Sequence, residues 1–336
     1  MRFVKRRLAL LVATILLNGA VSQSSDQQIL VYKKKYVMGT VFEIAAYAGS
    51  TRNASDAIDK AFGEIVRIDD LMSNYKPDSA LSILNRSAHF HAQKVPLDLY
   101  QAIERAVQFS KLSGGKFDIT VGPLVNLWKA ALAGDSMPTS DQRTRAQECV
   151  GYEKIELTPP DQVMFRSSCM QLDLGAIGKG YAVDRAGEIL QGSGIRNAFI
   201  NSGGSTILAM GSPPGQSGWL VHLRDPSHKI DPYVVLKDQS VSTSEQTEHS
   251  LLAAESAGHI IDPTTGTPVD TRFAVSVITN LGTPSDGLST TLLLLGPKAG
   301  KAVVYGMNNV SAIWVSPKAE FETATTATQI LFGKQL

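Results

Sequence analysis

Apolar residues recur along the chain at two spacings, and each spacing predicts a different kind of element. Between Ser55 and Leu71, and again from Leu97 to Leu112, they return every three or four residues, which predicts two helices. The segment Val31–Tyr47 alternates and is rich in β-formers, which predicts strand with a break at Met38-Gly39-Thr40. Ser55 is the expected N-cap of the first helix, and Gly114-Gly115 would end the second.

The second half of the chain is richer in strand patterns. Residues 118–140 are a mixed stretch broken by Pro and Gly, and a hairpin is expected within 152–174. Helices are expected at about Tyr181–Gln191, Gly287–Leu295 and Ala299–Tyr305, and strands at Asn197–Asn201, near 218–224, 233–243 and 273–279, and at Val310–Val315. Strands and helices are partly segregated and joined by hairpin-length connections, so we predict an α+β fold with mainly antiparallel sheets.

Composition narrows the choice of partners. The chain has 336 residues and is 43% apolar, which is ample for one large domain or two lobes. Its net charge is +1, and basic residues do not cluster outside the N-terminus. Nucleic acid is therefore not an expected partner.

The first residues have the organisation of a secretory signal peptide. A basic segment, Lys5-Arg6-Arg7, precedes the apolar run Leu8–Leu17, and Ala20-Val21-Ser22 suits cleavage. The run is about half of the roughly 20 residues needed to cross a bilayer, so a cleaved signal over 1–22 is favoured over a membrane anchor. No Cys follows the run for lipid attachment. We expect an exported, periplasmic protein, by either the general or the twin-arginine route.

Cys149 and Cys169 allow two interpretations. They flank two strand-like runs, Tyr152–Leu157 and Val163–Arg166, joined by Pro159-Pro160-Asp161, and a hairpin would bring them within reach of each other. In an oxidising compartment they can form one disulfide. Two free buried thiols would also fit the sequence.

Two distant segments carry the strongest chemical signal. Leu172–Gly180 has a carboxylate, a Gly-rich turn and Lys179 before an expected helix, without P-loop spacing; free N–H groups at such a helix start attract phosphate. Asp286 and Thr290 are four residues apart, so on a helix they share a face and offer hard oxygen ligands for Mg²⁺. An ordinary turn with a solvated Lys, and an N-cap Asp with a packed Thr, are the simpler alternatives. Together the segments suggest a divalent cation beside a phosphate-bearing ligand.

Two more segments hold candidate functional side chains. His259–Pro268 is a strand end that runs into a Pro-Thr-Thr-Gly turn, and His259 could act as a general base because its ordinary pKa lies near neutrality. A purely structural turn is the alternative. Tyr75 follows an expected helix end, where it could stack on a planar ring or simply pack.

Taken in order, these segments resemble the ApbE family of FAD:protein FMN transferases. The resemblance spans nearly the whole chain after residue 22, and its common order makes individually weak motifs specific. It is carried by Met38-Gly39-Thr40, Met72–Asn85, Gly115–Trp128, Leu172–Asp184, Asn201–Gly204, His259–Pro268 and Ser285–Gly296.

The resemblance implies a T-fold-related α+β domain over 23–336, FAD as donor substrate and Mg²⁺ as cofactor. The implied reaction transfers FMN from FAD to a Thr or Ser hydroxyl of a redox protein and releases AMP. The implied Mg²⁺ ligands are the Ala176 carbonyl, Asp286 and Thr290, with His259 as the base and Lys179 as a catalytic charge. The expected FAD contacts are Met38, Tyr75, Lys116, Phe117, Asp118, Asp173, Lys179, Ile260 and Ile261.

The chain departs from the family pattern in three places. Glu245–His249 follows Val241–Ser244 where a Gly and an aromatic- and arginine-rich run are usual, Ser205 stands where Asp or Asn is frequent, and Lys129 where Gly is common. These changes bear on flavin-edge contacts or partner docking more than on the cation site.

Two alternatives therefore stay open: an FAD pyrophosphatase that gives FMN and AMP, and a non-catalytic periplasmic FAD-binding protein. By resemblance, the acceptor is an exported or membrane-bound redox subunit, through which the protein would associate peripherally with the inner membrane. The sequence identifies neither the acceptor nor the oligomeric state.

Overall fold

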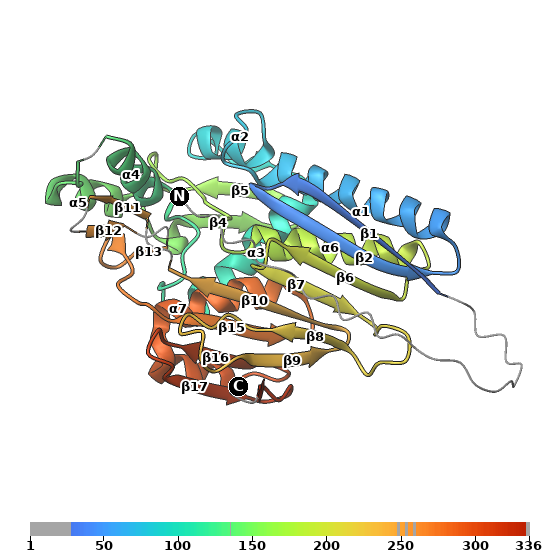
Figure 1. The fold of residues 1–336 in the computed structure, drawn as a ribbon. Coiled ribbons are helices and arrows are strands. Elements are labelled where there is room, and N and C mark those ends of the chain that lie inside the picture. The colour runs from blue at the N-terminus through green and yellow to red at the C-terminus, as the bar shows by residue number, and fades with distance from the viewer. Residues whose placement is uncertain (1–27, 135, 247–248, 253–254, 258–259, 334–336) are drawn as a thin grey trace, which may run out of the picture.

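An eight-stranded antiparallel sheet forms the centre of the computed structural model, which describes residues 28–134, 136–246, 249–252, 255–257 and 260–333 (Figure 1). The strand order is β1-β2-β6-β7-β10-β15-β16-β17, and every neighbouring pair is antiparallel. The predicted α+β class is thus confirmed. The strands are β1 (Ile29–Val37), β2 (Thr40–Ala48), β6 (Asn197–Ser202), β7 (Thr206–Met210), β10 (Gln239–Glu245), β15 (Ala274–Thr279), β16 (Ser311–Val315) and β17 (Phe321–Thr325).

Three helices, α1 (Thr51–Met72), α6 (Gly178–Gly192) and α7 (Gly282–Tyr305), cover one face of this sheet. Helix α1 begins four residues before the predicted start, because Ser50 caps it by accepting a hydrogen bond from the Asn53 amide at 3.2 Å. Helix α7 bends at Gly296, whose φ of 70° is not helical, and this break explains why the pattern predicted two helical segments there. Helix α3 (Leu97–Leu112) has its predicted bounds.

A small antiparallel sheet, in the order β18-β9-β8, covers part of the opposite face. Its strands are β8 (Trp219–His222), β9 (Pro232–Leu236) and β18 (Leu331–Phe332). The single strand predicted over 233–243 is therefore wrong: the chain reverses at Asp238, where φ is 53°, and divides into β9 and β10. Val234 and Val241 face each other across a second core, so the alternating pattern continues through the reversal.

The remaining elements lie around the end of the main sheet at which β1 turns into β2. They are α2 (Ala80–Ser87), β3 (Gln93–Lys94), α4 (Gly122–Ala133), α5 (Ser140–Glu148), η1 (Tyr152–Lys154), β4 (Ile155–Thr158), β5 (Gln162–Phe165), β11 (His249–Leu252), β12 (Glu255–Ala257), β13 (Ile261–Asp262) and β14 (Thr267–Pro268). Helix α4 lies in the stretch predicted to be mixed. The predicted hairpin is β4–β5, and Cys149 and Cys169 form a disulfide beside it, which resolves the two interpretations.

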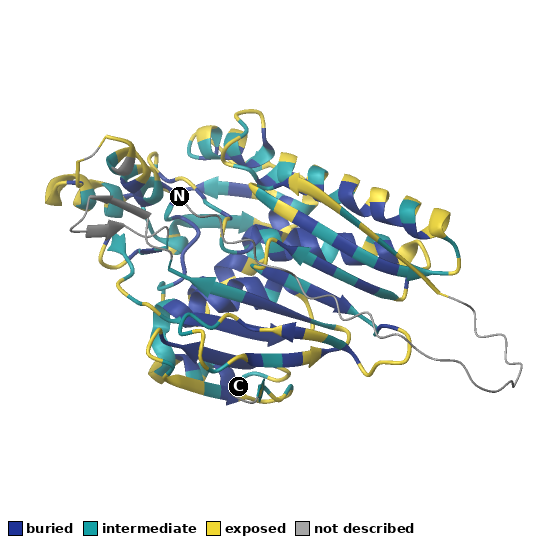
Figure 2. Ribbon diagram, in the orientation of Figure 1, coloured by how far each residue is buried: buried dark blue, intermediate teal, exposed yellow. Residues whose placement is uncertain are grey.

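Burial follows this layering (Figure 2). The inward residues of β2 are fully buried under the helices, as Phe42 and Ile44 show. On the opposite face, strands β1 and β2 extend beyond the small sheet, and Tyr32 and Val41 there are exposed. No helix in the described ranges is long and apolar enough to cross a membrane.

Candidate active site

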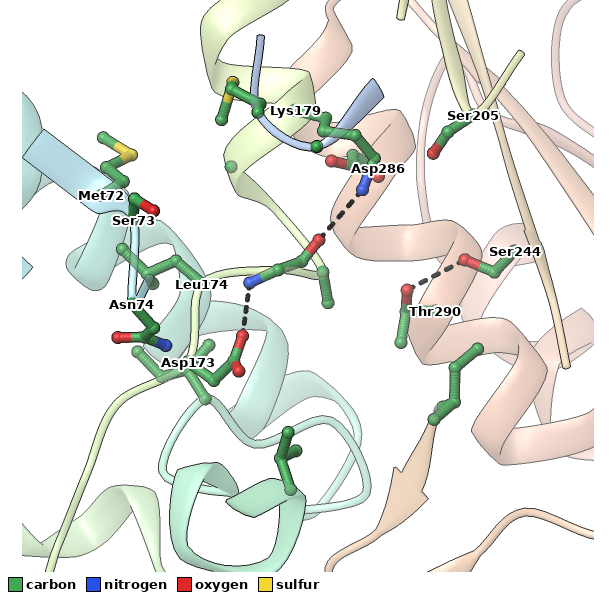
Figure 3. Close-up of a pocket in the computed structure, with 18 of the residues that line it drawn as sticks. Met72, Ser73, Asn74, Asp173, Leu174, Lys179, Ser205, Ser244, Asp286 and Thr290 are labelled. Atoms are coloured by element: carbon green, nitrogen blue, oxygen red, sulfur yellow. Dashed lines mark hydrogen bonds between the residues drawn. The ribbon is translucent and has the colours of Figure 1, made fainter. Parts of the chain in front are cut away.

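A cavity of about 1180 Å³ opens where the β1–β2 turn, the starts of α6 and α7, and the end of β10 converge (Figure 3). All of the predicted site residues in the described part of the chain line it: Met38, Tyr75, Lys116, Phe117, Asp118, Asp173, Ala176, Lys179, Ile260, Ile261, Asp286 and Thr290. The predicted base, His259, lies outside the described residues. The fold therefore collects residues that are far apart in sequence, while their chemical roles stay predictions.

Asp286 joins the starts of helices α6 and α7. Its Oδ2 accepts a hydrogen bond from the Gly180 amide at 2.8 Å, and its side chain is 4% exposed. In a regular helix this amide would bond to the Ala176 carbonyl four residues earlier. Ala176 lines the cavity, and its carbonyl oxygen accepts no hydrogen bond from the described part of the chain.

The two helices approach so closely that only glycine fits at the contact. A Cβ atom on Gly180 would lie 2.3 Å from the Gly282 carbonyl oxygen and 2.6 Å from Asp286 Cβ. Asp184, one turn further along α6, accepts hydrogen bonds from the Thr283 amide at 2.7 Å and from the Thr283 hydroxyl at 2.6 Å. These contacts fix Asp286 relative to the Gly-rich turn of α6.

Burial raises the pKa of Asp286 above its ordinary value, although Lys179 and the Gly180 amide favour the charged form. A cation at this position would offset the burial and hold the carboxylate ionised. Lys179 itself donates to the Gly175 carbonyl at 3.3 Å and lines the same cavity. At the start of α6, the ammonium group of Lys179 and the carboxylate of Asp286 from α7 therefore lie near each other, as Figure 3 shows.

Thr290 lies one turn after Asp286 on α7. Its hydroxyl is 2.9 Å from the Ser244 hydroxyl, which is also 2.8 Å from that of Ser289. This bond connects α7 to the end of β10. A carboxylate, a hydroxyl and a carbonyl are hard oxygen donors suited to Mg²⁺. The described residues contain no group of three or more His, Cys, Asp or Glu that could hold a metal ion. Among the predicted ligands, only Asp286 is a carboxylate.

The turn that carries Asp173 is fixed by residues from α2 and from the end of α1. Asp173 Oδ1 accepts from the Gly175 amide at 2.8 Å. Asn85 bonds the Leu172 amide at 2.8 Å and the Leu172 carbonyl at 3.0 Å, and Asn74 donates to the same carbonyl at 3.1 Å. The two asparagines hold the backbone before the Gly-rich turn, a role that the sequence patterns did not reveal.

Three of the predicted FAD contacts are occupied by structural interactions. The Asp118 carboxylate accepts from the Thr120 amide at 2.8 Å and from the Tyr152 amide at 2.9 Å, so it orders the local backbone. Phe117 is buried against Phe109, with ring centroids 5.8 Å apart. Lys116 binds the carboxylate of Asp262 and the hydroxyl of Thr264, both at 2.7 Å.

Tyr75 and Met38 lie at the rim of the cavity. The Tyr75 side chain is 80% exposed, and Lys129 donates to its hydroxyl at 2.9 Å while lying 4.8 Å from the ring centre. Lys129 is one of the departures from the family pattern. Met38 has a φ of 53° in the tight β1–β2 turn, and this turn places its side chain near Gly178 at the start of α6.

Gln246, in the divergent segment after β10, positions the turn that holds Ile260. Its amide nitrogen donates to the Ile260 carbonyl at 3.0 Å and to the Val269 carbonyl at 3.1 Å, and its oxygen accepts from the Ile260 amide at 3.0 Å. On the far side of the turn, Trp128 donates to the Gly266 carbonyl at 2.9 Å. The backbone that presents Ile260 and Ile261 to the cavity is thus held from both sides.

Comparisons with known proteins identify the family of the chain. A sequence model of the ApbE family matches residues 38–314. The chain belongs to the ApbE family. A protein from Treponema pallidum named FAD:protein FMN transferase is 30% identical, covering 91% of this chain and 90% of that relative. A Vibrio cholerae protein of the same name is 28% identical, over 87% of this chain and 88% of its own length.

Solved structures confirm the ApbE-type fold. The flavin transferase ApbE from Vibrio cholerae superposes with a TM-score of 0.77 at 26% identity, covering 89% of this chain and 98% of the other. An ApbE protein from Thermotoga maritima gives a TM-score of 0.79 at 25% identity, with coverage of 89% and 98%. The order of motifs in the sequence therefore indicated the correct family.

Proposed function

We propose that this protein transfers FMN from FAD to a Thr or Ser hydroxyl of a redox protein, in a reaction that needs Mg²⁺ and releases AMP. As a member of the ApbE family it is a transferase, and its relatives are named for FMN transfer from FAD. The observation that carries the finer proposal is the junction of α6 and α7, where Asp286, Lys179 and Ala176 line one cavity and the Ala176 carbonyl accepts no hydrogen bond from the described residues.

The donor set of this junction fits a magnesium ion. Ala176, Asp286 and Thr290 would hold the ion through oxygen, leaving its other positions for water and phosphate oxygens. When bound, Mg²⁺ would neutralise charge on the pyrophosphate of FAD. Lys179 adds a positive charge from the same helix start, where backbone N–H groups also favour phosphate.

The chain's own groups supply the remaining chemistry. His259, by its place in the family motif, takes the proton of the acceptor hydroxyl as the oxygen attacks the phosphorus of the FMN half. The bond from that phosphorus to the AMP oxygen breaks, and AMP leaves with its charge stabilised by Lys179. Positioning and electrostatics dominate such phosphoryl transfers.

We also propose that the protein works in the periplasm. The signal-like residues 1–22 support this location. The Cys149–Cys169 disulfide supports it as well, because disulfides persist mainly in oxidising compartments. The acceptor would then be an exported redox protein or the exported part of a membrane redox subunit.

The first test compares the wild-type protein with Asp286→Asn in FAD, Mg²⁺ and a candidate acceptor domain. We expect the variant to lose turnover by about 100-fold or more, because the only carboxylate of the junction's donor set is neutralised. Chromatography would follow FAD, FMN and AMP, and mass spectrometry the acceptor. Asp141→Asn, a change of the same kind at an exposed position of α5, is the matched control.

Each outcome of this test has a distinct meaning. A gain of one FMN on the acceptor together with AMP release supports the transferase. Free FMN and AMP at the same rate without acceptor would identify an FAD pyrophosphatase, and FAD binding without any cleavage would identify a binding protein. Wild-type turnover by Asp286→Asn would refute the cation site.

A further inference from the structure

A second cavity, of about 530 Å³, adjoins the first on the outer face of the main sheet. The two cavities share Gly204, Arg224 and Thr243 as lining residues. Along β10, Ser244 faces α7 and contacts Thr290 at 2.9 Å, whereas its neighbour Glu245 pairs with Arg224 at 2.7 Å. Thr243, which lines both cavities, is thus the sequence neighbour of Ser244, which contacts the hydroxyl of Thr290, a proposed cation ligand.

Strand β8 leads into this second cavity and has a free edge. Among the described strands it pairs only with β9. The Leu223 amide donates to the Pro232 carbonyl at 2.7 Å, so residues in step with Leu223 direct their backbone groups to β9. The N–H and C=O groups of Leu220 and His222 therefore point away from β9, and the Leu220 side chain is 57% exposed.

The start of β8 packs on the outer faces of β6 and β2. Trp219 makes this contact: its indole N–H donates to the Met210 carbonyl at 3.1 Å, and its ring lies 5.3 Å from that of Phe199 and 6.0 Å from that of Tyr47. After Trp219, the outward backbone groups of Leu220 and His222 form the unpaired side of the strand among the described strands. We name these groups the β8 edge.

The β8 edge leads toward the active site. Trp219 marks its far end beside Phe199, and β6 and β8 both proceed from there to residues that line the cavities, Gly203 and Gly204 after β6 and Arg224 after β8. A chain lying along the β8 edge would reach the cavity wall next to Ser244 and Thr290. This is the side from which a second substrate can approach without crossing the Lys116 and Asp173 side of the cavity.

We propose that β8 binds the acceptor polypeptide as an added strand, which delivers its hydroxyl through the second cavity; this inference rests on the proposed transferase function. A row of unpaired backbone N–H and C=O groups is matched by another extended backbone. Side chains of the added strand would alternate between solvent and the outer face of the main sheet at Phe199 and Tyr47. The site thus takes an extended segment with small or apolar residues at every second position.

The test uses proline at an outward position of β8. Leu220→Pro removes the outward N–H and places a ring on the edge, while the bonds of Val221 to β9 remain. Leu220→Ala is the matched control, because it removes the same side chain and keeps the N–H. His222→Pro repeats the test one pleat closer to the cavity. The acceptor probe is a redox domain that the wild-type protein labels with FMN in the presence of FAD and Mg²⁺.

We expect Leu220→Pro and His222→Pro to lower kcat/KM for the acceptor about tenfold or more, through KM, with FAD affinity and melting temperature unchanged. Leu220→Ala should stay within about twofold of wild type. In amide hydrogen exchange, saturating acceptor should protect Leu220 and His222. Unchanged acceptor KM in both proline variants, or protection of these amides by self-association without acceptor, would overturn the proposed acceptor binding at β8. A wild-type protein that cleaves FAD but labels no acceptor would instead refute the transferase function itself.

Discussion

Single side chains hold the cavity together more than the sequence motifs suggested. Gln246 is the clearest case, because one amide group satisfies three backbone groups of Ile260 and Val269. It belongs to the segment in which the chain departs from the family pattern. The divergent segment therefore supplies contacts that fix the turn of Ile260.

Gln246→Ala should weaken FAD binding about tenfold, because the Ile260 amide loses its acceptor and the Ile260 carbonyl keeps only the bond from the Val269 amide. Gln246→Glu should restore part of the loss, since a carboxylate still accepts from the Ile260 amide. FAD affinity can be measured by fluorescence titration. Gln239→Ala, at the opposite end of β10 where Gln239 bonds Thr328, serves as the control. Equal FAD affinity in all the proteins would mean that the turn holds its position without Gln246.

The sequence predicted residues that line the cavity better than it predicted the residues that support them. Asp286 and Thr290 were recognised because their spacing on a helix puts both oxygens on one face, and the structure brings them to the cavity. Asn85 and Gln246 were not recognised, because each acts on a backbone segment that sequence spacing does not connect to it. For Asp118, the motif did not reveal that the carboxylate binds two nearby backbone amides.

At the scale of elements, the connection between β8 and β9 is organised by one carboxylate. Asp225 accepts hydrogen bonds from the amides of Ser227, Lys229 and Ile230. Burial acts to raise the pKa of Asp225, but the hydrogen bonds outweigh it and lower the pKa from 3.8 to about 2. This connection forms one wall of the second cavity.

The pH dependence of stability follows from the direction of this shift. Because the pKa is lower in the folded protein, Asp225 contributes stability that is complete above its unfolded value of 3.8 and is lost as pH falls toward 2. We expect the difference in unfolding free energy between wild type and Asp225→Asn to be constant from about pH 5 upward and to shrink below it. Urea unfolding at a series of pH values measures it. A difference that grows on acidification would contradict the assignment.

Element prediction succeeded where one face was buried and failed where the chain reversed without a break in the pattern. Helix α3 matches its predicted bounds because its apolar stripe faces the core along its whole length. Strands β9 and β10 were merged because Val234, Leu236 and Val241 all face the same second core. Helix α4 was missed because Gly122 and Pro123 at its start are typical of loops, although Pro is favoured in the first turn of a helix.

On the scale of the whole molecule, the disulfide ties the end of α5 to the segment between β5 and the Asp173 turn. Cys149 ends α5, and Cys169 lies between β5 and the buried residues Met170 and Leu172. The bond closes a loop with a sequence separation of 20. It therefore restrains the unfolded chain over residues 149–169, just before the turn whose Asp173 lines the cavity.

Replacing both cysteines, Cys149→Ser with Cys169→Ser, should lower the free energy of unfolding by about 3 kcal/mol, the value for closing a loop of this length. Urea unfolding measures the change. Wild-type protein reduced with a thiol should behave like the double variant, which provides the control. An unchanged midpoint in the double variant would show that the disulfide adds no net stability.

The cavity is lined by residues from Tyr36 to Leu294, so one wall comes from the first strands and another from one of the last helices. A growing chain shorter than 294 residues therefore lacks part of the lining. If export takes the general route, on which chains cross the membrane unfolded, the protein cannot carry a bound nucleotide with it. Its donor would then have to be supplied outside the cytoplasm.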